Sequence, residues 1–420
     1  MEQHTEQDAR SISMKPWAKA LEGKTVLFVA DIYIDGGAPS CLIELVRELI
    51  NTYRMRCIVL TSQRSWVNDE LESMGAKTIV TEHDQFLIVR SRAVWKSVAK
   101  FALFGLEHVF KYWPAIKRAE RQLDFNEVDI VHSNMVRTDL GEALARRHGK
   151  LHVCHIREFS FSYFHCMSLR RNPAKWLSDT SDVLIPVSEA VREAWVRRGA
   201  DSHKMRVVYD GVEAERITAC AEALHRETDG DDENPVDRPI KFVFIGGIVA
   251  EKGVWEALDA LDTVHKSGRD ATLDIYGGGI PNAGQELASY TDGAGIDNIV
   301  TYHGYDTDVS EKLGLYDVGL VCTKLEGFGR AVIEFNAAGL PVIAANRGAL
   351  PELVEAGVTG FLYGDDGQTL AGCMMKFCDD RQLVAEMREP ARRKAQEFTS
   401  ARTAEEVVKI YAELLDGDGQ

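Results

Sequence analysis

No apolar run in this 420-residue sequence approaches the roughly 20 residues that a helix needs to cross a bilayer, so we do not expect an integral membrane protein. Positive charge is scarce: the 49 lysines and arginines are outnumbered by 65 aspartates and glutamates, and the formal net charge is −16. This balance argues against a nucleic-acid-binding body, because neutralising phosphates needs an excess of lysine and arginine. The eight cysteines lack the spacing of a small disulfide scaffold. Because we find no signal peptide, we expect buried thiols in a reducing cytosol.

Short apolar runs of strand length alternate with amphipathic helical stretches in both halves of the chain. This alternation predicts an α/β protein with two doubly wound, Rossmann-like domains whose carboxyl-terminal strand ends face each other across a cleft. The expected strands are Lys24–Ala30, Arg56–Ser62, Val128–Ser133, Leu151–Ile156, Asp182–Val187, Met205–Tyr209, Ile240–Gly246, Ala271–Tyr276, Asn298–His303, Asp317–Cys322 and Pro341–Ala345.

The acidic, proline-containing stretch HRETDGDDENPVDRP has no apolar period, which indicates a linker or an exposed loop between the domains. A last helix with one apolar face must pack on another part of the chain, and the N-terminal domain is the candidate. The expected division is a disordered lead-in 1–23, an N-terminal domain 24–215, a linker 216–239, a C-terminal domain 240–400 and a C-terminal helix 401–420.

The stretch Lys324–Tyr363 carries two carboxylates, Glu326 and Glu334, with seven residues between them. Gly327 and Gly329 predict a tight turn at the end of a strand, and a helix is expected to start near Arg330. The amino-terminal end of that helix suits an anion such as a diphosphate. Carboxylates at such a place suit sugar hydroxyls, which they accept hydrogen bonds from.

Two further loops offer phosphate contacts. Gly36 and Gly37 follow the first strand, and their backbone N–H groups can approach a phosphate because neither residue has a Cβ. The alternative is that this pair forms a tight turn and nothing more. Lys252, in a glycine-rich loop ahead of a helix, can balance phosphate charge as a point cation.

Residues 86–122 are basic in an otherwise acidic chain, and aromatic residues are interleaved with the cations. This composition favours a patch that contacts an anionic membrane surface. The alternative is an ordinary buried helix with a solvated charged edge. The basic residues are Arg90, Arg92, Lys96, Lys100, Lys111, Lys117, Arg118 and Arg121, and the aromatic ones are Trp95, Phe101, Phe104, Phe110, Tyr112 and Trp113.

Histidine and cysteine residues gather around the strand Leu151–Ile156, which ends near His155 and Glu158 at the expected rim of the sheet. A zinc site is the alternative role for them. Irregular spacing argues against zinc, and along a strand His152 and Cys154 point away from the side of His155.

The motif EGFGRAVIEFNAAGLPVIA, followed by NRGALPELVEAGVTGFL, closely resembles the E-x7-E signature of retaining nucleotide-sugar glycosyltransferases, the large family often numbered four. The segments FIGGIVAEKG, IYGGG, VDIVHS, PVSEAV and VVYDGVE support the resemblance over most of the chain. It implies the GT-B architecture of two facing domains. It also implies transfer of a sugar from a nucleotide-diphosphate sugar, UDP-sugars being favoured over GDP-sugars, to a glycan, lipid-linked or other hydroxyl acceptor in polysaccharide or glycoconjugate biosynthesis.

The resemblance also implies a role for each matching residue. Glu326 is expected to hold donor-sugar hydroxyls, Glu334 the ribose, and Lys252 the diphosphate. The backbone of Gly327, Phe328 and Gly329 contacts sugar and phosphate, Gly36 and Gly37 close on the diphosphate, backbone near Tyr305 meets the base, and His155 lies near the reacting sugar. The N-terminal domain is expected to bind the acceptor.

One departure concerns the phosphate loop, where the family usually has an arginine and this sequence has Gly247. We hypothesise that Arg330 or Arg157 supplies the second cation. Asp210 also stands where asparagine is common. No Asp-x-Asp metal motif is evident at the expected site, so neither a metal nor another cofactor is expected. Two alternatives stay open: a nucleotide-sugar epimerase on the same fold, and a non-catalytic sugar-nucleotide-binding subunit.

Overall fold

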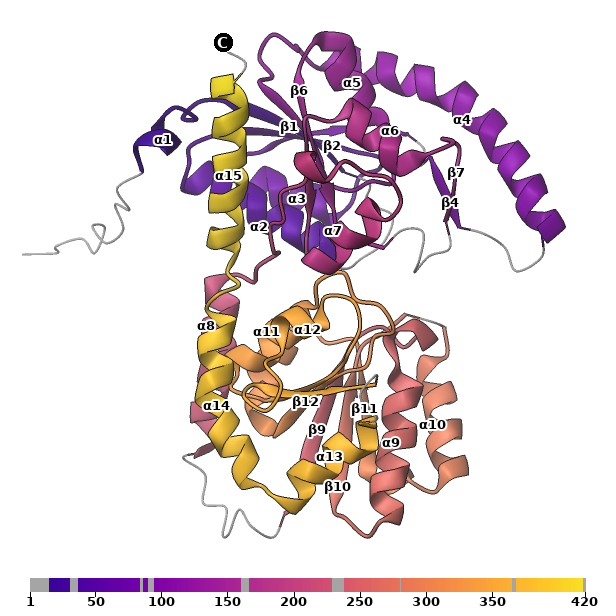
Figure 1. The fold of residues 1–420 in the computed structure, drawn as a ribbon, viewed down its shortest axis with the longest axis vertical. Coiled ribbons are helices and arrows are strands. Elements are labelled where there is room, and N and C mark those ends of the chain that lie inside the picture. The colour runs from indigo at the N-terminus through magenta and orange to yellow at the C-terminus, as the bar shows by residue number, and fades with distance from the viewer. Residues whose placement is uncertain are drawn as a thin grey trace, which may run out of the picture.

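The computed structural model describes residues 15–30, 37–83, 86–89, 94–159, 166–228, 238–279, 281–364 and 368–417. The chain forms two α/β domains, one above the other in Figure 1, and each contains a six-stranded sheet. All neighbouring strands in both sheets are parallel. The predicted fold class is therefore confirmed.

The N-terminal sheet contains β1 (Thr25–Ala30), β2 (Arg56–Thr61), β3 (Lys77–Val80), β5 (Ile130–Ser133), β6 (Leu151–Ile156) and β8 (Val183–Pro186). Their order is β3-β2-β1-β5-β6-β8. The central strand β1 is buried at every position, as expected for a parallel strand covered on both faces. The helices are α2 (Gly37–Asn51), α3 (Trp66–Ser73), α4 (Val94–Gln122), α5 (Leu140–His148), α6 (Pro173–Thr180) and α7 (Glu189–Val196), and β4 (Leu87–Val89) pairs with β7 (Cys166–Ser168) in a small antiparallel ribbon.

The C-terminal sheet repeats this topology with β9 (Ile240–Ile245), β10 (Ala271–Tyr276), β11 (Val300–Gly304), β12 (Val318–Val321), β13 (Val342–Ala345) and β14 (Gly360–Tyr363), in the order β11-β10-β9-β12-β13-β14. In both domains the order reverses beside the first strand, which is where doubly wound sheets bind ligands. The helices are α9 (Val254–Lys266), α10 (Ala283–Ala294), α11 (Arg330–Ala337), α12 (Leu350–Leu353), α13 (Leu370–Asp379) and α14 (Gln382–Ala395), and the short 3-10 turns include η2 (Ala250–Lys252) and η4 (Val309–Leu315).

One expected strand, Met205–Tyr209, does not form. The chain runs beside β8, where Val208 N–H donates to the Pro186 carbonyl at 3.1 Å, but only Met205 pairs with Leu184 as an isolated bridge. Pro186 has no N–H to donate in return, so the ladder cannot continue.

The predicted linker 216–239 is wrong over its first half. Helix α8 (Ala214–Thr228) occupies it and packs against η4 and α11. Ile217 and Cys220, three residues apart, are 3% and 0% exposed and supply the buried face that the sequence pattern did not reveal. Residues 229–237 lie outside the described part of the chain.

The two ends of the described chain pack together on the N-terminal domain. Helix α15 (Ser400–Gly417) lies against α2 and against α1 (Pro16–Lys19), as Figure 1 shows. Leu21 is 1% exposed in the same cluster, so the expected disordered lead-in 1–23 is packed from α1 onward. The Tyr411 hydroxyl reaches His132 Nδ1 at 2.5 Å and ties α15 to β5.

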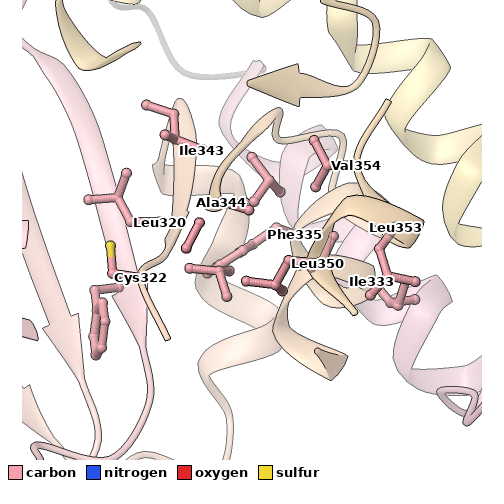
Figure 2. Close-up of a cluster of buried hydrophobic side chains, with 14 of the residues drawn as sticks. Leu320, Cys322, Ile333, Phe335, Ile343, Ala344, Leu350, Leu353 and Val354 are labelled. Atoms are coloured by element: carbon pink, nitrogen blue, oxygen red, sulfur yellow. The ribbon is translucent and has the colours of Figure 1, made fainter. Parts of the chain in front are cut away.

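The start of α11 is positioned by a buried apolar cluster (Figure 2). Ile333 and Phe335 of α11 lie with Leu350 and Leu353 of α12 and with Leu320 of β12, and all five are fully buried. This packing fixes the loop between β12 and α11 at the edge of the sheet.

Candidate active site

A cavity of about 540 Å³ lies between the two domains, at the carboxyl-terminal ends of both sheets. The C-terminal domain contributes the ends of β9 and β12 and the loop that leads into α11. The N-terminal domain contributes the start of α2, the residues after β6, and Asp210. The predicted site residues that line it are Gly37, Lys252, Glu326, Gly327, Phe328, Gly329 and Arg330.

The loop Glu326–Gly329 forms one wall, and its two glycines are required by geometry. Gly329 has a φ of +113°, a conformation that favours glycine, and it turns the chain into α11. A Cβ on Gly327 would lie 2.6 Å from the Arg157 carbonyl oxygen of the other domain. The Ser188 hydroxyl donates to the Gly327 carbonyl at 2.7 Å, so the loop touches both domains. The positive end of the α11 dipole therefore lies at the cavity.

Lys252 and Glu326 face each other across the cavity wall. Lys252 Nζ lies 2.8 Å from Glu326 Oε2. Their loops are joined by Lys324 N–H, which donates to the Glu251 carbonyl at 3.0 Å. The lysine and glutamate side chains are 34% and 20% exposed, so a ligand can reach both. One cation and one acceptor-only carboxylate at the same place suit a phosphate and a sugar hydroxyl.

Arg157, the first residue after β6, is a buried cation in the cavity wall. Its guanidinium forms an ion pair with Asp210, and the two side chains are 5% and 8% exposed. Its Nε and Nη2 also donate to Asn134 Oδ1 at 3.3 and 3.2 Å. The arginine is therefore fixed in orientation, with one carboxylate balancing its charge.

Arg330 links the domains. Its Nη1 and Nη2 donate to the two carboxylate oxygens of Glu44 on α2 at 2.9 and 2.6 Å, in a bidentate pair. The hypothesis that Arg330 or Arg157 replaces the cation absent at Gly247 stays a prediction. Both arginines line the cavity, but both already pair with carboxylates, so a diphosphate would have to share them.

Glu334, the residue expected to hold the ribose, does not line the cavity. It is 6% exposed, and its Oε1 lies 2.9 Å from Arg216 Nε. Arg216 belongs to α8, the helix that packs on α11 where a linker was expected. The ribose-binding role of Glu334 stays a prediction. To bind the ribose hydroxyls, the Glu334 carboxylate would have to give up or share its ion pair with Arg216.

His155 lies at the carboxyl-terminal end of β6, as expected, but its side chain does not line the cavity, so its place near the reacting sugar stays a prediction. The side chain is 0% exposed, its ring lies 5.4 Å from that of His132, and Nδ1 lies 3.4 Å from Arg157 Nη2. Arg157, two residues further along and just after β6, does line the cavity. The strand is buried to its last residue, Ile156, so the His155 ring stays inside the domain, whereas Arg157 lies beyond the strand's end.

Three buried histidines, His132, His152 and His155, give a testable pH dependence. Burial lowers the pKa of His152 to about 4 and holds those of the other two well below 6.5. Below about pH 6.5 the unfolded chain binds protons that the folded chain does not, so stability is lost as pH falls. As the pH falls below about 6.5, we expect each of these histidines to lower the free energy of unfolding by about 1.4 kcal/mol per pH unit. This loss continues until the pH reaches the pKa of that histidine in the folded protein.

Denaturant unfolding at a series of pH values between about 7.5 and 5 measures this slope. His152→Gln removes one titrating group and should make the slope shallower by about 1.4 kcal/mol per pH unit. An unchanged slope in that variant contradicts the assignment of His152 as a buried neutral imidazole.

Tyr305 and Gly36 complete the predicted set. Tyr305 follows β11 and is 78% exposed, close to the Gly278 backbone at the rim of the C-terminal sheet, but it does not line the cavity. Gly36 lies outside the described residues. Gly37 begins α2, and a Cβ there would lie 3.6 Å from Arg330 Cδ, so this glycine lies beside the interdomain pair.

Sequence reasoning missed the carboxylates that pair with the site arginines. Asp210 carried one signal, its departure from the usual asparagine, but nothing in the sequence links positions 157 and 210 or 44 and 330. Glu352 was also missed: its carboxylate accepts from Glu189 N–H at 3.0 Å and Ala190 N–H at 2.8 Å, which caps α7 from the other domain. Long-range pairs such as these appear only once the two domains are placed together.

The zinc alternative gains no geometric support in the part of the chain that the structure describes. There, no group of three or more His, Cys, Asp or Glu side chains could hold a metal ion. His152 instead hydrogen-bonds Ser133 Oγ at 2.9 Å and Ser181 Oγ at 3.0 Å. Cys41 lines the cavity, but burial raises its pKa to about 12, so the thiol stays protonated.

Family models match both halves of the chain. Residues 35–216 match Glycosyltransferase Family 4, and residues 225–395 match Glycosyl transferases group 1. With the two facing Rossmann-like domains, these matches define the chain as a glycosyltransferase of the GT-B architecture. Its N-terminal domain carries the family 4 pattern and its C-terminal domain the group 1 pattern.

Similar proteins come from several bacteria. EpsD of Bacillus subtilis, whose name assigns it provisionally to the glycosyltransferases, is 26% identical over 72% of this chain and 81% of its own. A D-inositol 3-phosphate glycosyltransferase of Jonesia denitrificans is 31% identical over 50% of this chain and 52% of its own. The amylovoran biosynthesis glycosyltransferase AmsK of Erwinia amylovora is 24% identical over 56% of this chain and 57% of its own. All three names place these relatives among the glycosyltransferases.

Solved structures share the fold. Anabaena Alr3699/HepE in complex with UDP has a TM-score of 0.72 and 18% identity, over 93% of this chain and 100% of its own. The same protein in complex with UDP-glucose has a TM-score of 0.70 and 20% identity, over 94% and 99%. A glycosyltransferase from Rickettsia africae has a TM-score of 0.71 and 19% identity over the same fractions.

Proposed function

We propose that the protein transfers a sugar from a nucleotide-diphosphate sugar to a hydroxyl acceptor with retention of anomeric configuration. The bond between the anomeric carbon and the diphosphate oxygen breaks, and a bond from the anomeric carbon to the acceptor oxygen forms. The acceptor proton passes to the leaving diphosphate. Transfer goes through an oxocarbenium-like transition state, without a nucleophilic carboxylate pair, so Glu326 and Glu334 are not a hydrolase acid/base couple.

The observation that carries this proposal is the pairing of Lys252 with Glu326 at the start of α11. Negative charge develops on the diphosphate as the glycosidic bond breaks, and a lysine and a helix dipole at that point stabilise it. Glu326 accepts hydrogen bonds from the hydroxyls of the donor sugar. Ligand binding separates the ion pair and gives each side chain a partner of suitable chemistry.

We propose a UDP-sugar as the donor, ahead of a GDP-sugar, and no metal. The family resemblance and the UDP and UDP-glucose complexes of a protein with the same fold support this choice. The acceptor is a glycan or a lipid-linked sugar. A peripheral position on the cytoplasmic face of a membrane, reached through residues 86–122, is part of the proposal; no helix in the described ranges is both long and apolar enough to cross a membrane.

Thermal unfolding in the presence of UDP, GDP, UDP-glucose and GDP-mannose tests the donor. A ligand at about 100 times its dissociation constant should raise the free energy of unfolding by about 2.7 kcal/mol. We expect stabilisation by UDP ligands, and release of UDP from UDP-sugars when a hydroxyl acceptor is added. Stabilisation by GDP alone contradicts the donor assignment. Conversion of the donor to an epimer without acceptor, or binding without turnover, contradicts the transferase mechanism.

A further inference from the structure

Helix α4 is packed into the domain along only part of its length. After Pro114 its residues enter the core, and Ala115, Ile116 and Ala119 are at most 1% exposed. Before Pro114 the helix runs outward from the N-terminal domain, beside β4 and β7 (Figure 1). There it carries a series of large apolar side chains that are more than half exposed, and of these the Trp113 ring has the Arg147 guanidinium 5.7 Å from its centroid.

These side chains form a single stripe. Leu103, Leu106, Phe110 and Trp113 are 63%, 60%, 76% and 53% exposed, and their spacing of three and four residues places them on one side of the helix. We call these four residues the outer face of α4. An exposed apolar stripe of this kind marks an interaction surface, because monomeric soluble proteins rarely leave one uncovered.

The opposite side of α4 makes the contacts with the domain. His108 Nε2 lies 3.5 Å from the buried Asp139 Oδ2, and the Gly105 backbone packs beside Leu169. Tyr112 is partly buried against the core cluster that contains Ile116. These contacts fix the orientation of α4 about its own axis. The outer face, on the opposite side of the helix, therefore points away from the domain.

The charge on α4 is opposite to that of the whole protein. Val94–Gln122 contains six lysines and arginines and two glutamates, in a chain whose net charge is −16. Lys100 and Lys117 are exposed at the two ends of the outer face. A partner for this surface must accept apolar side chains and supply negative charge beside them.

We propose that the outer face of α4 lies in the headgroup region of an anionic lipid bilayer, with Lys100 and Lys117 against the lipid phosphates. A tryptophan and a phenylalanine on a basic amphipathic helix are typical of such contacts. A second copy of the chain fits less well, because pairing two outer faces would bring like charges together. The proposal rests on the peripheral location in the proposed function and identifies the face that makes the contact.

Flotation with lipid vesicles tests it. The full-length protein is mixed with phosphatidylcholine vesicles or with vesicles of phosphatidylcholine and phosphatidylglycerol at low salt. We expect binding to the anionic vesicles and at least about tenfold weaker binding to the neutral ones, because each lysine near an anionic surface contributes roughly a fivefold factor in affinity. Leu106→Gln with Phe110→Gln, and separately Lys100→Glu with Lys117→Glu, should each weaken binding by more than about tenfold.

Matched controls lie elsewhere on the surface. Trp66→Gln with Val358→Gln removes two apolar side chains that are 50% and 46% exposed, and Lys19→Glu with Arg393→Glu reverses two exposed charges. Both control pairs should bind vesicles as the unchanged protein does. Absence of binding to anionic vesicles, or equal loss in the controls, overturns the proposal.

Light scattering and sugar turnover complete the test. If Leu106→Gln with Phe110→Gln converts a lipid-free dimer to a monomer in light scattering, the outer face is a protein interface and the proposal is overturned. UDP release from a UDP-sugar with a soluble acceptor should be unchanged in the α4 variants. Failure of vesicle binding with turnover intact therefore rejects this inference alone, whereas loss of turnover in every form of the protein rejects the proposed function.

Discussion

Replacing Lys252 with alanine is expected to lower kcat/KM for sugar transfer by about 10² to 10³, the usual effect of removing one group that stabilises charge in a transition state. Lys252 is the lysine of the cavity wall, and its partner Glu326 lies 2.8 Å away at the start of α11. Loss of the cation removes a partner of the leaving diphosphate and leaves the carboxylate close to phosphate charge. Steady-state release of nucleotide diphosphate measures the effect.

Lys324→Ala is the matched control, because Lys324 is an exposed lysine two residues before Glu326 and does not line the cavity. It should retain kcat/KM within about twofold, since its exposed side chain is not part of the cavity wall and a solvated charge interacts only weakly through water. If Lys252→Ala is as active as Lys324→Ala, the phosphate-binding role of Lys252 is wrong. A further loss of stability in Lys252→Ala alone would instead indicate a structural ion pair.

Asp210→Ala is expected to lower the free energy of unfolding by about 3 to 5 kcal/mol, because it leaves a buried arginine without its counter-charge. Arg157 and Asp210 are 5% and 8% exposed, so water replaces the lost carboxylate only poorly. Urea unfolding measures the change. The same variant should also weaken donor binding, since an unbalanced Arg157 is no longer held in one orientation in the cavity wall.

The exposed pair between Arg197 and Glu193 is the control for this effect. Its atoms are 3.1 Å apart, but the side chains are 69% and 62% exposed. Glu193→Ala should therefore change stability by no more than about 0.5 kcal/mol. A double variant, Arg157→Met with Asp210→Leu, should recover part of the lost stability because it removes both charges. Equal effects of Asp210→Ala and Glu193→Ala would show that burial does not govern the pair.

The architecture could be predicted because most strands of the two sheets are short apolar runs, which can be recognised from neighbouring residues alone. The strands that were not predicted are β4 and β7 of the small ribbon and, in the two large sheets, β3 and β14, which lie at the sheet edges. Edge strands are partly exposed, and β3 begins and ends on exposed residues, Lys77 and Val80, so its pattern is weak. Helix α8 was not predicted because, among its residues whose side chains are described, Ile217 and Cys220 alone are buried, and the acidic stretch that follows favoured a linker.

In the candidate site, too, the features that depend on neighbouring residues could be predicted, and those that depend on distant residues could not. Glu326, Gly327 and Gly329 lie in one loop, so a local motif could place them together at the cavity. Arg157 with Asp210, and Arg330 with Glu44, are pairs between distant segments, and no spacing predicts them. His155 lies at the strand end that the sequence predicts, but a strand boundary does not tell whether the side chain there is buried or open to the cleft.

The position of helix α15 has a consequence for the folding of the protein during its synthesis. Val407, Val408 and Tyr411 belong to the core of the N-terminal domain, although they follow the whole C-terminal domain in the sequence. During translation the N-terminal domain therefore cannot complete its core until the C-terminal domain and α15 have been synthesised, and the apolar side of α2 stays uncovered until then. A proteolytic cut between the domains would separate α2 from its cover, so isolating either half is expected to yield an aggregation-prone fragment and not a working module.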